Sequence, residues 1–211
     1  MELVMEKAEL DVELLVCMVQ DGPLGKRISH PLVNEIFYIP EMNSQYNKIL
    51  AYKKKALDEA WDKQDWASYV NIHEKPWRAE KLYKIMGLVP AKEWWELVAE
   101  VWMGSENIWQ NKKLWQKMLT FSSGDRNDMM NAAERKVFAS LCAKETVTLY
   151  RGYSVGKGDK WGFSWTTDKA KALWFAQRFS KKPKVETQEV FTNNIIAYLN
   201  GRGEKEVIWI P

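Results

Sequence analysis

The chain has 211 residues, of which 46% are hydrophobic and 28% charged, with a net charge of +3. This composition is typical of a globular protein with a sizeable core and excludes a disordered or fibrous chain. No apolar run approaches the roughly 18 residues of a membrane span, which excludes a membrane-spanning class. Because the acidic start "MELVMEKAEL" lacks the basic segment of a secretory signal, we expect a cytoplasmic protein without a membrane partner.

Residues 1–145 are predicted to be mostly helical, because apolar residues recur at helical intervals between Pro and Gly punctuation. The segment over 30–42 is ambiguous and reads as a short extended piece. The expected helices cover residues 9–19, 47–70, 76–87, 90–104, 106–119 and 126–141, the last with Asp125 as its N-cap.

Tryptophan is unusually frequent, with twelve in the chain. In the helix expected over 90–104, Trp94, Trp95 and Trp102 lie on one broad face, and the helix over 106–119 repeats the pattern with Trp109 and Trp115. Large aromatic side chains bury much apolar area each, so we interpret these residues as core rather than as a cofactor site.

From residue 146 the sequence changes to β-branched and aromatic segments. Strands are predicted over 146–154, 163–167 and 204–210, and one or two strands over 184–199, with a helix over 168–180 that Asp168 caps. Helices first and strands later predict an α+β protein, in which a helical N-terminal part packs on a mostly antiparallel β core. We expect residues 1–70 to be a helical extension and 71–211 the main domain, with helices over 71–145 and the β core over 146–211.

Three short motifs carry the candidate chemistry. They are Arg151-Gly152 in "LYRGY", Ser164-Trp165-Thr166 in "GFSWTTD", and Glu204-Lys205-Glu206 at the start of the last strand. Alternation along a strand puts Glu204 and Glu206 on one face. Each motif alone has an ordinary structural explanation, as a salt-bridge partner, a β-forming pair or a solvated strand end.

Together and in this order, the motifs resemble the mono-ADP-ribosyltransferases of the Arg–Ser–Glu class, especially phage and bacterial toxin-like members. The resemblance covers residues 146–210 and implies the fold of that family, with NAD as substrate and no metal. It implies that Arg151 binds the NAD pyrophosphate, that Gly152 lets the backbone approach the nicotinamide, and that Ser164 holds the catalytic Glu206. It places Trp165 and Thr166 beside the cofactor.

The resemblance also assigns the remaining residues of the last motif. Glu204 orients or deprotonates the acceptor, and the turn Asn200, Gly201, Arg202 and Gly203 recognises it. A Glu at the first position of the pair implies transfer to protein arginine. Candidates for stacking on the nicotinamide are Trp161, Phe163 and Trp165.

Other functions stay open from the sequence. Residues 151–211 hold 11 Lys/Arg against 6 Asp/Glu, and this basic character favours a nucleic-acid acceptor as the second choice. NAD hydrolysis without transfer is a further alternative, and a non-enzymatic binding module is the weakest. An enzyme of this kind acts as a phage effector or bacterial toxin and is often held by an antitoxin or other inhibitory partner.

Overall fold

A computed structural model describes residues 8–20, 23, 25–154, 160–178 and 182–211. The chain forms two compact units, Met1–Ile85 and Met86–Pro211. The sequence predicted that the N-terminal extension ends at residue 70. The first compact unit continues to Ile85, because α4 (Lys75–Lys84) packs on α3 (Trp66–Ile72) within it. In the part of the chain that the structure describes, no helix is long and apolar enough to span a membrane.

The first unit contains a sheet that the sequence did not reveal. Strands β1, β2 and β3 pair antiparallel in that order, and their sheet follows the short helix α1. The helix expected over 9–19 is therefore wrong beyond Leu15, where α1 ends. The helix expected over 47–70 is divided at Gln64, whose positive φ of 54° is incompatible with a continuous helix. The elements are α1 (Val12–Leu15), β1 (Met18–Gln20), β2 (Lys26–Ser29), β3 (Asn34–Glu35), η2 (Pro40–Met42) and α2 (Asn43–Asp62).

The core of the first unit lies between this sheet and α2. Its fully buried members share an apolar character and come from α1, β2, the turn after β2, and α2. They are Leu14, Ile28, Leu32, Val33, Tyr46 and Leu50. The unit is therefore mixed rather than mostly helical as expected, although β3 lies in the segment over 30–42 that reads as extended.

The second unit begins with the tryptophan-rich helices α5 (Ala91–Gly104) and α6 (Lys112–Leu119). The prediction of core tryptophans is confirmed for Trp94, Trp95, Trp102 and Trp115, all of which are fully buried. Trp102 and Trp115 meet edge to face with ring centroids 4.9 Å apart. Trp109 is an exception, since it is 68% exposed beyond the N-terminus of α6, and so is Trp61 in the first unit, at 45%.

The helix expected over 126–141 is two elements, η3 (Arg126–Met129) and α7 (Ala132–Cys142). Asp125 caps only η3. Asn131 caps α7 instead and forms a capping box, in which Glu134 accepts a hydrogen bond from the Asn131 backbone.

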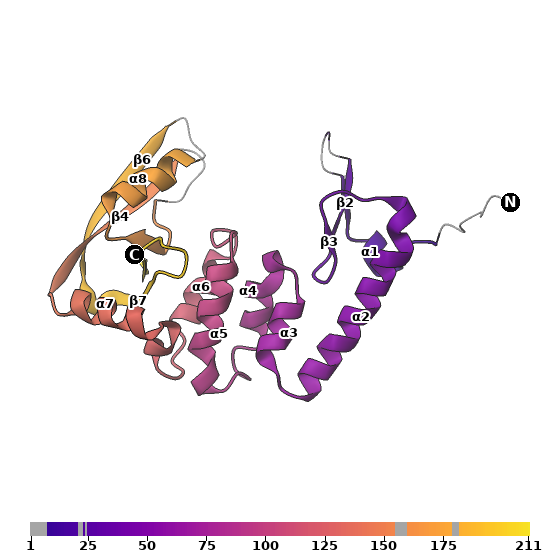
Figure 1. Cartoon of the computed structure of the whole chain (residues 1–211), viewed down its shortest axis with the longest axis horizontal. Coiled ribbons are helices and arrows are strands. Elements are labelled where there is room, and N and C mark those ends of the chain that lie inside the picture. The colour runs from indigo at the N-terminus through magenta and orange to yellow at the C-terminus, as the bar shows by residue number, and fades with distance from the viewer. Residues whose placement is uncertain (1–7, 21–22, 24, 155–159, 179–181) are drawn as a thin grey trace. The chain divides into compact units, whose positions relative to one another are not determined.

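The remainder of the second unit is one five-stranded antiparallel sheet in the order β6-β4-β5-β8-β7, with α8 against β4 and β6 (Figure 1). This confirms the predicted α+β class and the antiparallel sheet. Its members are β4 (Thr146–Ser154), β5 (Ser164–Thr166), α8 (Lys169–Arg178), β6 (Pro183–Phe191), η4 (Thr192–Asn194), β7 (Ile195–Leu199) and β8 (Glu206–Trp209).

Candidate functional site

A pocket of about 440 Å³ opens in the second unit, and all three sequence motifs reach it. Strands β4, β5 and β8 contribute most of the predicted residues, while the turn after α5 and one side of α8 complete the wall. The predicted residues that line the pocket are Arg151, Gly152, Ser164, Trp165, Thr166, Arg202, Glu204 and Glu206.

Strand pairing fixes the spacing of the motifs. Thr166 lies opposite Tyr150 on β4 and opposite Glu206 on β8, so three adjacent strands meet at this position. Ladder hydrogen bonds hold neighbouring strands about 4.8 Å apart. The motifs are therefore brought together by the sheet itself.

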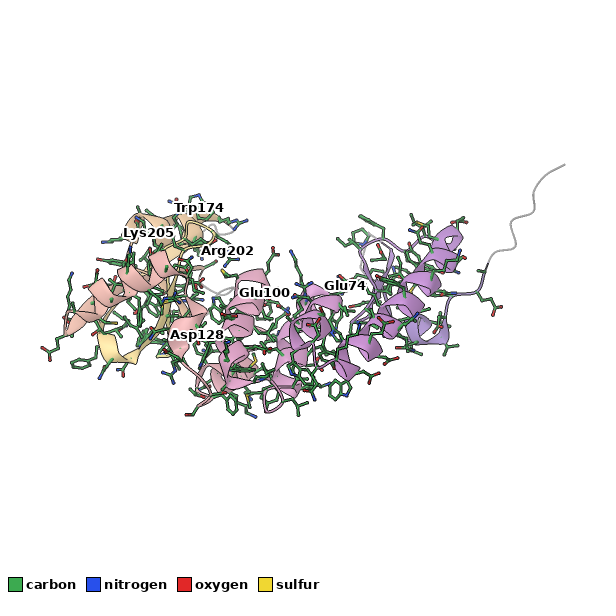
Figure 2. The ribbon with its side chains drawn as sticks, turned by 60° about the horizontal axis from the view of Figure 1, so that its bottom comes forward. Glu74, Glu100, Asp128, Trp174, Arg202 and Lys205 are labelled. Carbon is green, nitrogen blue, oxygen red and sulfur yellow. The ribbon has the colours of Figure 1, made fainter. Side chains whose placement is uncertain are left out.

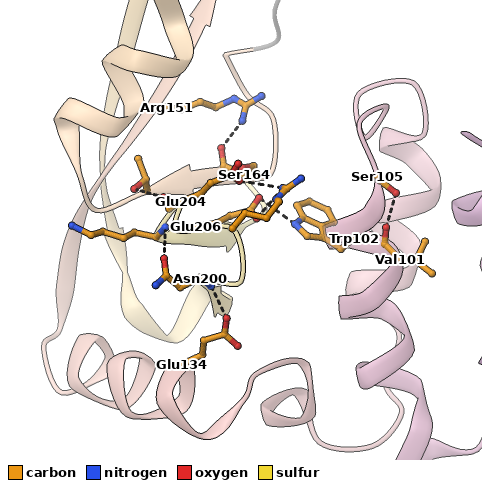
Figure 3. Close-up of polar contacts among 12 residues, drawn as sticks. Val101, Trp102, Ser105, Glu134, Arg151, Ser164, Asn200, Glu204 and Glu206 are labelled. Atoms are coloured by element: carbon orange, nitrogen blue, oxygen red, sulfur yellow. Dashed lines mark hydrogen bonds and ion pairs between the residues drawn. The ribbon is translucent and has the colours of Figure 1, made fainter. Parts of the chain in front are cut away.

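Glu206 is the most buried ionisable residue of the pocket, at 4% exposure. Trp102 Nε1 donates a hydrogen bond to its Oε1 at 3.1 Å (Figure 3). Arg202 Nη2 lies 3.9 Å from its Oε2. Burial raises the pKa of Glu206 above its ordinary 4.5, although hydrogen bonds from Ser164 and Trp102 and the Arg202 charge oppose this. The Ser164 contact is the one that the resemblance implied.

Glu204 lines the same pocket as Glu206, but not because the two residues alternate along one strand, as the sequence predicted. Glu204 precedes β8, and Lys205 has a positive φ of 51°, so strand alternation does not relate the two carboxylates. Arg202 joins them instead, with Nη2 3.1 Å from Glu204 Oε2. The Glu204 side chain is 22% exposed, which leaves it open to solvent while Glu206 is enclosed.

Arg151 enters the pocket from β4, and its Nη1 donates a hydrogen bond to the Ser164 carbonyl oxygen (Figure 3). Arg178 reaches the same pocket from α8, which packs on β4. The pocket is thus lined by arginines from β4, from α8 and from the turn before β8, and by two carboxylates near β8.

Three residues expected to contact the cofactor, Gly152, Thr166 and, as described next, Trp165, instead stabilise the fold around the pocket. A Cβ on Gly152 would overlap the Ala172 carbonyl and lie 2.7 Å from the Ala176 nitrogen, so this glycine lets α8 pack on β4. The Thr166 hydroxyl lies 3.3 Å from the Glu204 carbonyl oxygen, to which it donates.

Trp165 is 2% exposed and packs against Trp209 with ring centroids 5.0 Å apart. Phe163 is also buried, and Trp161 lines a different pocket with Phe163. The described contacts therefore do not favour any of these three rings as a stacking partner for a ligand in the main pocket.

The residues of the turn Asn200–Gly203 have different surroundings, and only one of them lines the pocket. Asn200 is fixed by two hydrogen bonds (Figure 3). Its backbone N–H donates to Glu134 Oε1 at 2.6 Å, and its side-chain Oδ1 accepts from the backbone N–H of Lys205 at 3.0 Å. Gly203 has a φ of 67°, which favours glycine. Arg202, which is labelled in Figure 2, is the one member of this turn that lines the pocket.

Sequence reasoning missed several residues that line the pocket or contact its carboxylates. Trp102 was assigned to the core by its helical spacing, and nothing in that pattern distinguishes the indole that binds Glu206. Ala172 and Phe175 were assigned only to the apolar face of the helix after the second motif, and Arg178 follows the periodicity of α8 without any motif of its own. The missed lining residues are Ser105, Glu106, Ile108, Tyr150, Ala172, Phe175 and Arg178.

Within the described ranges, no group of His, Cys, Asp and Glu is arranged to hold a metal ion. Searches of protein-family models, curated proteins and solved structures found no match to this chain. Function is therefore argued from the pocket and its residues.

Proposed function

We infer that the chain transfers ADP-ribose from NAD to a macromolecular acceptor, with protein arginine as the first choice. The observation that carries this proposal is the meeting of Arg151, Ser164, Glu204 and Glu206 in one pocket from three separate motifs. The antiparallel sheet with α8 against β4 supports an ADP-ribosyltransferase fold for the second unit.

The pyrophosphate of NAD is assigned to the guanidinium side of the pocket. The planar fork of an arginine matches phosphate oxygens and stays charged at any physiological pH. Arg151 is held by the Ser164 carbonyl, and Arg178 lines the same side. The nicotinamide ribose then points toward β8.

The chemistry is assigned to Glu206. Breaking the bond between the ribose C1 and the nicotinamide nitrogen leaves positive charge on the sugar, and the bonding electrons leave with nicotinamide. An ionised carboxylate in a low-dielectric site stabilises that charge without reorganising. Ser164 and Trp102 hold the Glu206 carboxylate for this purpose through hydrogen bonds.

Glu204 is assigned to the acceptor because it is the exposed member of the pair. It already contacts one guanidinium, that of Arg202, at 3.1 Å. An acceptor arginine in the same place would form the bond to the sugar carbon through a guanidine nitrogen, and its proton would pass to Glu204. This contact favours arginine over water as the acceptor, and so transfer over NAD hydrolysis.

A nucleic-acid acceptor is the second candidate, favoured by the charge of +5 that follows from 11 Lys/Arg and 6 Asp/Glu in residues 151–211. Such a substrate would bind through its phosphates, so labelling would fall steeply as salt is added. Protein labelling would depend on salt far less.

The test is incubation of a bacterial lysate with NAD labelled in the adenylate half, followed by separate protease and nuclease digestion. Label that protease releases supports a protein acceptor, and label that nuclease releases supports the second candidate. Release of nicotinamide without any incorporated label would leave only NAD hydrolysis. Failure to release nicotinamide at all would refute the proposal.

A further inference from the structure

Gly162, which lies before β5, borders the Arg151 guanidinium directly. A Cβ built on Gly162 would lie 3.0 Å from Arg151 Nε and still closer to Cζ and Nη2. The φ of Gly162 is outside the left-handed region, so the backbone conformation does not require glycine there. A side chain at this position would therefore occupy the space that the Arg151 guanidinium takes.

The guanidinium is confined on a second side as well. Arg151 Nη1 donates to the Ser164 carbonyl oxygen, two residues beyond Gly162. Moving the guanidinium away from Gly162 would therefore cost this hydrogen bond.

Gly162 itself is fixed. Its carbonyl oxygen accepts a hydrogen bond from Trp165 Nε1 at 2.7 Å, and the buried Trp165 ring packs edge to face on Trp209. The Gly162 peptide therefore cannot retreat to make room for a side chain without breaking a buried hydrogen bond.

We propose that Gly162 is a positioning residue, which holds the Arg151 guanidinium at the place where it binds a phosphate group. Trp165 supports it by holding the Gly162 carbonyl. The last step, binding of the NAD pyrophosphate, rests on the proposed function. The steric relation between Gly162 and Arg151 does not.

The two glycines near the pocket differ in what a side chain would meet. At Gly152 an added Cβ meets the backbone of α8, which cannot move independently of the helix. At Gly162 it meets the far end of a flexible side chain. Gly162→Ala is therefore expected to fold with the Arg151 guanidinium displaced.

The experiment uses the full chain in a double-mutant cycle of Gly162→Ala and Arg151→Ala. Gly87→Ala is the matched control, because a Cβ at Gly87 has no neighbour within 4 Å and that glycine is outside the pocket. Calorimetry measures NAD affinity, and urea unfolding measures stability without ligand.

We expect Arg151→Ala to weaken NAD binding by about ten- to hundredfold, the loss of a charge-assisted hydrogen bond. Gly162→Ala should cause a loss of the same order, and the double variant should bind no more weakly than Arg151→Ala alone. Gly162→Ala should lower the urea midpoint in the wild-type background only, because Arg151→Ala removes the group it collides with. If Gly162→Ala fails to fold, the double variant should fold.

The inference is overturned if Gly162→Ala binds NAD normally while Arg151→Ala does not. It is also overturned if Gly162→Ala lowers the urea midpoint equally in both backgrounds, or if neither Gly162→Ala nor the double variant folds. If Arg151→Ala binds NAD normally, the proposed role of Arg151 is wrong, and the urea cycle still decides the relation between the two residues.

Discussion

Glu206→Gln separates the charge of the buried carboxylate from its shape. The substitution keeps an oxygen that can accept from Trp102 Nε1, which donates to Glu206 at 3.1 Å. It removes the negative charge that, in the proposed function, stabilises the sugar cation. Nicotinamide release and transfer should therefore fall together, while NAD binding changes little.

The magnitude follows from the geometry around Glu206. The Arg202 guanidinium shows that a cation can lie 3.9 Å from this carboxylate. A unit charge at that distance is worth about 4 kcal/mol at an effective dielectric constant of about 20. Loss of that stabilisation in the transition state corresponds to about a thousandfold in rate, and removal of one preorganised group typically costs about 10²–10³.

The same substitution should stabilise the fold at neutral pH. Because burial raises the pKa of Glu206, the folded protein binds its proton more tightly than the unfolded chain does. The stability that the carboxyl contributes is full below its ordinary pKa of 4.5 and is lost as the pH rises through the folded pKa. Glu206→Gln should therefore raise the melting temperature at neutral pH, and the gain should vanish on acidification.

The assay measures nicotinamide release, label incorporation and melting temperature for Glu206→Gln and for Glu189→Gln. Glu189 is the matched control, since it lies exposed on β6, outside the pocket, where its carboxylate accepts a hydrogen bond from Thr146 Oγ1 at 2.8 Å. Nicotinamide release by wild-type protein should also fall as the pH drops through the raised pKa of Glu206. Undiminished turnover by Glu206→Gln would refute the assigned chemistry.

Three further outcomes are expected. Glu204→Gln should lower label incorporation while nicotinamide release to water largely survives, and equal loss of both would contradict the separate functions of the two carboxylates. Trp102→Phe removes a hydrogen bond that lowers the pKa of Glu206, so the acid limb of the pH–rate profile should shift to higher pH; an unshifted profile would contradict that contact. Gly152→Ala should destabilise the protein by about 1–3 kcal/mol in urea unfolding, because α8 must move away from β4; unchanged stability would contradict the close packing.

The second unit was largely predictable because its elements carry strong local patterns. β-branched and aromatic runs marked β4 and β8, and Asp168 marked the start of α8 by capping it. The strand order was not predictable. It depends on pairings such as Thr166 with Glu206, which join residues far apart in the sequence.

The first unit was less predictable because its strands are only two to four residues long. The apolar run around Val16 and Met18 fits a helix as well as a strand, and only the pairing of Met18 with Ile28 decides between them. At the candidate site, the sequence identified the charged residues of the three motifs, but it missed Arg178 on α8. It also missed Trp102, which donates to Glu206, and Gly162, which borders Arg151, since neither has a distinctive pattern around it.

The positions of the site residues are set by strand pairing and do not depend on the lengths of the loops between the strands. Tyr150, Thr166 and Glu206 stand side by side through ladder hydrogen bonds, so the connections between their strands need only be long enough to return the chain. Only twelve residues separate Arg151 from Ser164, yet both reach the same pocket. In evolutionary terms, such a sheet can gain or lose peripheral segments while the residues that line its pocket stay together.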